Sequence, residues 1–213
     1  MNVMKYINTI SIFLGVALLS SCVKHEVVPK PTYESDLSVS FQARMDGASY
    51  EIIEDIKGFS HEATQSKEIN PSPQASAITY NSTFSSSQKT DVVELRMGKL
   101  LFSSNNTETP SVENFYDFFY NGITQPIQFK DDAEDGVEFY FVDGSGRTWL
   151  SKENSGFPES FEFTDLEEDT DEQGDYLSFV ARFNVTVFTN PSDLTLSDTL
   201  EIQDAVFQGY FER

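Results

Sequence analysis

The sequence is poor in the residues that build disulfides, metal centres and nucleophilic active sites. Its 213 residues include one cysteine and two histidines. A single cysteine cannot form a disulfide within the chain, so the stability of the fold must come from an apolar core. A zinc site needs more nitrogen or sulfur ligands than this, and a Ser-His-Asp triad would depend on His61. We therefore expect a non-enzymatic protein with no cofactor.

Basic residues and long apolar runs are also scarce. Fourteen Lys and Arg stand against 35 Asp and Glu, which gives a formal net charge of −21. This charge excludes nucleic acid as a partner and opposes contact with anionic head groups. The longest apolar run, within residues 7–19, is too short and too often interrupted for a spanning helix. Nineteen Phe and nine Tyr, by contrast, indicate a packed domain rather than a disordered chain.

The N-terminus has the features of a secretory signal. Lys5 provides a basic start, an apolar stretch follows, and Leu19-Ser20-Ser21-Cys22 closes it. This ending resembles the lipobox of bacterial lipoproteins. The resemblance implies that Cys22 is the first mature residue and carries acyl chains such as palmitate, which together anchor a protein firmly. The residue after the cysteine is not Asp, which favours the outer membrane. We expect a signal peptide at 1–21, a lipidated tether at 22–35 and one domain at 36–213.

Alternating apolar and polar residues predict a mainly β domain. Clear period-two runs occupy residues 37–43, 78–84 and 177–187, with Gly-containing turns between the runs. Thr109-Pro110 predicts the start of one short helix. The polar segment 54–73 is expected to be a long loop. The fold class that follows is an antiparallel β-sandwich of jelly-roll type, or a partly open barrel, with one short helix.

Five segments of the sequence form a recognisable order: 41–47 (FQARMDG), 139–151 (FYFVDGSGRTWLS), 160–163 (SFEF), 181–183 (ARF) and 200–211 (LEIQDAVFQGYF). Together they resemble uncharacterised lipoproteins of Bacteroidetes. The resemblance implies a lipidated β-sandwich domain and covers most of residues 37–213, but its turn-and-strand motifs imply no catalytic residues.

Two acidic turns, 169–174 and 131–136, are candidate calcium sites, but the second has Ala133 and Val142 where an EF-hand loop needs ligands. Asp169, Asp171 and Gly174 match the start of an EF-hand loop, but the twelfth position is Val180 where that loop needs Glu. The alternative is a solvated acidic turn. We therefore predict no metal site. Asp169 and Asp171 are the residues that would bind calcium if this turn held it.

Trp149, Tyr140 and Asp143 form the candidate ligand site. An aromatic face beside a carboxylate is the arrangement that binds sugars, and these residues flank the Asp143–Gly146 turn. The alternative is that Trp149 packs at the edge of the core. Asp198-Thr199-Leu200 resembles the acceptor motif of Bacteroidetes O-glycosylation, which implies modification of Thr199. The alternative is that Thr199 only begins a strand.

The sequence therefore predicts a lipoprotein of the outer membrane, on its periplasmic face or at the cell surface, with a non-enzymatic binding domain. Its expected partners are the membrane, through the N-terminal lipid, and a glycan or an envelope protein. The main alternative is a structural or adhesive subunit, such as a fimbrial accessory protein. A glycoside hydrolase with paired carboxylates is the less favoured alternative.

Overall fold

A computed structural model describes residue 35, residues 37–104 and residues 108–213. Cys22, the signal peptide and most of the predicted tether lie outside these residues. Within the described part of the chain, no helix is both long and apolar enough to cross a membrane.

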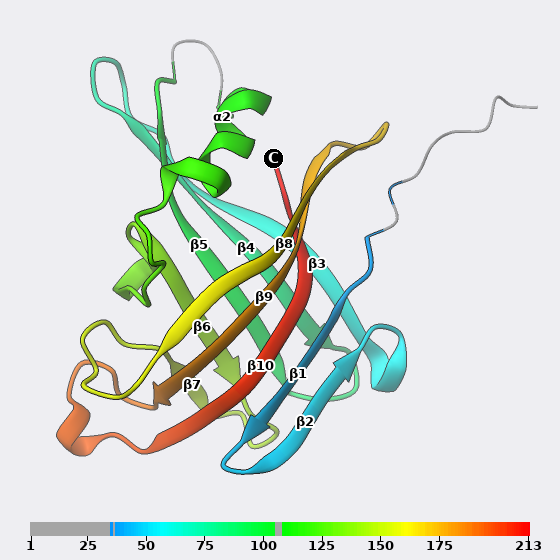
Figure 1. The fold of residues 1–213 in the computed structure, drawn as a ribbon, viewed down its shortest axis with the longest axis vertical. Helices are drawn as coiled ribbons and strands as arrows, with labels where there is room; N and C mark the ends of the chain where they lie inside the picture. Colours follow the sequence, from blue (N-terminus) through cyan, green and yellow to red (C-terminus); the bar gives the residue numbers. More distant parts are fainter. Residues whose placement is uncertain (1–34, 36, 105–107) are drawn as a thin grey trace, which may run out of the picture. The chain divides into compact units, whose positions relative to one another are not determined.

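The described chain folds into one curled antiparallel sheet of ten strands (Figure 1). The strand order is β2-β1-β10-β9-β7-β6-β5-β4-β3, and β8 also pairs with β9. The mainly β fold is thus confirmed. Of the two forms predicted, the chain takes the partly open barrel and not the jelly-roll sandwich, because one sheet curls on itself and no second sheet packs against it in the described residues. The strands are β1 (Ser40–Met45), β2 (Ala48–Ile53), β3 (Phe59–Glu68), β4 (Ser76–Ser86), β5 (Val92–Phe102), β6 (Gly136–Val142), β7 (Thr148–Leu150), β8 (Ser160–Thr170), β9 (Asp175–Phe188) and β10 (Thr199–Glu212).

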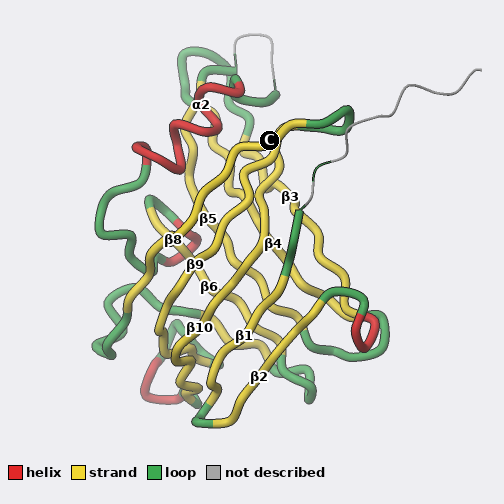
Figure 2. The backbone as a smooth tube through the Cα atoms, turned by 45° about the vertical axis from the view of Figure 1, so that its right-hand side comes forward, coloured by secondary structure: helices red, strands yellow, loops and turns green. Residues whose placement is uncertain are grey.

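The predicted helix is present between β5 and β6. Helix α2 (Val112–Asp117) continues into a π-helical turn, Phe118–Gly122. Ser111 caps it, because its hydroxyl accepts a hydrogen bond from the Asn114 amide at 3.1 Å. Figure 2 shows the helix at one end of the sheet. Short 3-10 turns lie at Ile56–Gly58, Asp131–Ala133 and Leu194–Leu196.

The core is a cluster of aromatic rings between the two halves of the curled sheet. Phe41 on β1 lies 5.9 Å, between ring centroids, from Phe139 on β6, and Phe139 lies 5.2 Å from Phe183 on β9. All three side chains are almost fully buried. Each ring comes from an inward position of an alternating strand, so the alternation that predicts the strands also selects the core.

Segment 54–73 differs from the long loop expected from its polar sequence. It is not a single loop, because β3 pairs with β4 from Phe59 to Glu68. β3 lies at one end of the strand order and has few apolar residues, so its sequence lacks the usual strand signal. Its inward polar side chains instead contact β10. Gln65 Nε2 donates to the Glu212 carbonyl at 2.6 Å, and the His61 ring lies 4.5 Å from that of Tyr210.

Candidate functional site

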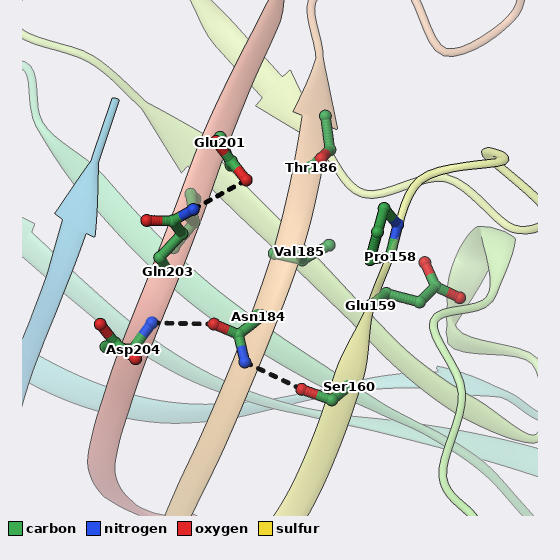
Figure 3. A pocket seen from close by; sticks show the side chains of 10 residues that line it. Pro158, Glu159, Ser160, Asn184, Val185, Thr186, Glu201, Gln203 and Asp204 are labelled. Atoms are coloured by element: carbon green, nitrogen blue, oxygen red, sulfur yellow. Dashed lines mark hydrogen bonds between the residues drawn. The ribbon is translucent and has the colours of Figure 1, made fainter. Parts of the chain in front are cut away.

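A polar groove crosses the outer face of β8, β9 and β10, and we call it the outer groove. It consists of two adjoining cavities of about 550 and 390 Å³, which share Ser160, Asn184 and Asp204. Volumes of this order are typical of small-ligand sites. Figure 3 shows the side chains around the larger cavity, contributed by three neighbouring strands and by the segment before β8.

A row of hydrogen bonds crosses the floor of the outer groove. The Asn184 side chain on β9 donates from Nδ2 to the Ser160 hydroxyl on β8 at 3.0 Å, and its Oδ1 accepts from the Asp204 amide on β10 at 2.9 Å (Figure 3). Beside this row, Gln203 Nε2 donates to Glu201 Oε1 at 2.8 Å. The row fixes the positions of amide, hydroxyl and carboxyl groups that all face outward.

A β-bulge in β10 produces this arrangement. Between the pairs Ile202–Val185 and Ala205–Phe183, two residues of β10 stand opposite the single residue Asn184. Asp204 has φ of +50°, the left-handed conformation that Asp tolerates better than most residues. The Asp204 amide cannot join the regular ladder and bonds to the Asn184 side chain instead. Bulges of this kind redirect side chains and are frequent beside functional sites.

The groove carries more negative than positive charge. Glu159, Glu201 and Asp204 line the larger cavity, and Arg182 is the cation of the smaller one. Partial burial raises the pKa of Glu159, and repulsion from Glu153 raises it further. The groove therefore suits a neutral or cationic ligand with many hydrogen-bonding groups. Its amides and hydroxyls both donate and accept, as sugar hydroxyls do.

The structure places the predicted ligand residues at the turn between β6 and β7. Trp149 is only 6% exposed and donates from Nε1 to Asp143 Oδ2 at 3.0 Å. The Arg147 guanidinium lies 5.3 Å from the centre of its ring, and Arg96 covers the ring of Tyr140 at 4.8 Å. In this arrangement Trp149 packs at the edge of the core, as the alternative interpretation held, and its face is not open to a sugar.

Asp143 organises that turn. Its Oδ1 accepts hydrogen bonds from the Ser145 amide at 2.8 Å and the Arg147 amide at 3.0 Å. Burial alone would raise the pKa of Asp143, but hydrogen bonds from Ser145, Trp149 and Arg147 outweigh burial and lower it to about 2. The carboxylate is thus occupied by its own turn.

The calcium candidates lie at the tip of the β8–β9 hairpin. Asp171 Oδ1 accepts from the amides of Gln173 at 2.7 Å and Gly174 at 3.2 Å, and its Oδ2 accepts from the Ser35 amide at 3.3 Å. These bonds lower the pKa of Asp171, and the bond from the Gln173 amide has the largest effect. Asp169 lies in β8, where its carbonyl accepts from Tyr116. Among the described residues, no three His, Cys, Asp or Glu side chains are grouped to hold a metal ion.

The remaining predicted residue, Thr199, is the exposed first residue of β10. The outer groove was not predicted as a site, although its signal is present in the sequence. Outward residues of β9 include Ser178, Arg182, Asn184 and Thr186, a polar face on the longest alternating run. In β10 the buried positions change from even numbers at Ile202 to odd numbers from Ala205 onward, which requires one extra residue and so marks the bulge.

Comparisons with models of known protein families, with curated proteins and with solved structures find no match for this chain.

Proposed function

We propose that this protein is a lipoprotein anchored to the outer membrane through Cys22, and that its β domain binds a glycan without cleaving it. The observation that carries the binding role is the hydrogen-bonded row Ser160–Asn184–Asp204, which spans three strands at the floor of an open groove. The lipid anchor rests on the Leu-Ser-Ser-Cys pattern.

A glycan suits the groove because its hydroxyls need both hydrogen-bond donors and hydrogen-bond acceptors as partners. Each sugar hydroxyl donates and accepts, and the groove offers carboxylate acceptors beside amides and hydroxyls. Phe161 and Phe183 border the smaller cavity, but both are buried beneath the polar groups. Affinity would therefore come from hydrogen bonds rather than from aromatic stacking. Because the groove has an excess of carboxylates, the proposed ligand is a neutral or amino-sugar polymer.

The alternative of a structural or adhesive subunit needs an apolar edge strand ready to pair. β8 pairs with β9, and its exposed residues include Glu162, Glu167 and Glu168. Charged side chains on an edge strand oppose pairing with another chain. This edge therefore favours a binding domain over a polymerising subunit.

Binding is tested by titrating the full chain with soluble neutral and amino-sugar oligosaccharides in a calorimeter. Asn184→Ala removes the centre of the row and should weaken binding about tenfold or more. Ser160→Ala, which leaves the bond from the Asp204 amide in place, should weaken binding less. Gln173→Ala, an exposed change at the hairpin tip, is the matched control. Equal affinities for Asn184→Ala and Gln173→Ala would refute the groove as the site.

Two further measurements separate the alternatives. Release of reducing sugar that is lost in Glu201→Gln or Asp204→Asn would show a hydrolase rather than a binding domain. Cys22→Ser should release the protein from membranes, and a variant that still sediments with the envelope would refute the anchor.

A further inference from the structure

A shallow, open cavity lies apart from the outer groove, between the β4–β5 loop and the β6–β7 turn. It has a volume of about 600 Å³ and is lined by residues 87–91 and Gly144. It shares no lining residue with the outer groove. The Thr90 hydroxyl donates to the Asp143 carbonyl at 3.2 Å, so the two segments are held together. We call it the Asp91 pocket.

Asp91 gives this pocket an accessible acceptor. The residue is only 7% exposed, and its Oδ1 accepts a hydrogen bond from the Tyr50 hydroxyl at 3.0 Å. No group in the described ranges donates to its Oδ2. An ionised carboxylate offers about four lone-pair sites, so Asp91 Oδ2 can accept further hydrogen bonds. Because Asp91 lines the cavity, a ligand there can donate to this oxygen.

The other lining groups indicate which ligand this is. Lys89 balances the charge of Asp91, so the pocket is formally neutral and does not call for a second cation. Ser87, Gln88 and Thr90 add side chains that donate and accept. A hydroxyl already bonds one oxygen of Asp91, and a second hydroxyl fits the other. We propose that the Asp91 pocket binds a neutral polyhydroxyl ligand, such as a single sugar unit, with one hydroxyl donating to Asp91 Oδ2.

Gly144 leaves the free oxygen open. A Cβ added at this position would lie 3.6 Å from Asp91 Oδ2 and would meet nothing closer. That is ordinary van der Waals contact, and the Gly144 backbone lies outside the left-handed region. Gly144→Ala should therefore cover the oxygen without straining the fold. It is a variant that blocks the pocket while it leaves Asp91 and its bond to Tyr50 in place.

The experiment is a two-dimensional NMR titration of the full chain carrying Cys22→Ser with methyl α-glucopyranoside. We expect saturable shifts at the amides of Asp91 and Gly144, with a dissociation constant in the millimolar range. Asp91→Asn retains an acceptor for Tyr50 but removes the charge, and it should weaken binding about tenfold or more. Gly144→Ala should do the same, and Lys89→Gln should weaken binding less.

Asn184→Ala in the outer groove is the control, and it should leave these shifts unchanged. The two sites can therefore be tested separately, because loss of glycan binding in the outer groove does not predict loss of sugar binding in the Asp91 pocket. If methylammonium instead gives saturable shifts and binds more tightly to Lys89→Gln, the pocket is a cation site and the proposal is overturned. No saturable shift with the sugar, or equal affinity in Gly144→Ala, would also overturn it.

Discussion

Acid should destabilise this protein through one half-buried histidine, His61. The His61 ring packs against Phe84 and Tyr210, and its Nε2 lies 2.7 Å from the Ser82 hydroxyl. Its Nδ1 is buried and has no hydrogen-bond partner. Burial lowers the pKa of His61 from 6.5 to about 4. Between these two values the unfolded chain binds a proton that the folded chain does not, so the free energy of unfolding falls as the pH falls.

The magnitude follows from the two pKa values. One unit of pKa difference corresponds to about 1.4 kcal/mol. Through His61 alone, the free energy of unfolding should fall by about 2 kcal/mol between about pH 7.5 and about pH 5, and by about 3 kcal/mol in total below about pH 4. The contribution is complete above the unfolded pKa and is lost as the pH falls through this window.

The assay is urea unfolding of the wild type and of His61→Gln at both pH values. Glutamine can still bond to the Ser82 hydroxyl but does not titrate. The difference in stability between the two proteins should change by about 2 kcal/mol in favour of the variant at the lower pH. Carboxylates such as Glu212, whose pKa burial raises, are common to both proteins and cancel. An unchanged difference would refute the burial argument.

Three further predictions concern the core, the β6–β7 turn and the bulge. Phe183→Ala, which leaves a cavity among the rings of β1, β6 and β8, should cost about 3–5 kcal/mol in urea unfolding, and a loss below about 1 kcal/mol would contradict the packing. Asp143→Ala should cost about 1–3 kcal/mol at neutral pH. This cost should shrink toward about pH 2, as the pKa of Asp143 predicts, and a constant cost would be inconsistent with it. Asp204→Gly should raise the thermal midpoint by a few degrees because glycine adopts φ of +50° freely, and a lower midpoint would argue against strain there.

The sequence predicts the sheet well because inward apolar residues determine it. The runs through Phe41, Tyr80 and Phe183 all form strands whose odd or even positions are buried as expected. Edge strand β3 is different, since its inward positions include His61 and Gln65. Their partners lie on β4 and on β10, far along the chain, so no local pattern identifies the strand.

The packing of Trp149 could not be predicted from the sequence either. The sequence places it beside a Gly-rich turn, where both an exposed and a packed ring are consistent with the pattern. The hydrogen bond from Trp149 to Asp143 and the guanidinium of Arg147 over the ring decide the outcome, and both depend on how the turn closes. Composition and alternation contain no information on that closure.

The outer groove arises from a conflict between the two halves of β10. Residues from Ala205 onward must bury odd positions against the aromatic core, while Ile202 must bury an even one. A regular strand cannot satisfy both halves, so the extra residue is forced outward and takes Asp204 with it. The Asn184 side chain then supplies the bond that the Asp204 amide lost. The demand of the core thus creates the polar row on the opposite face, and a substitution that removed the bulge would have to unpack one half of β10.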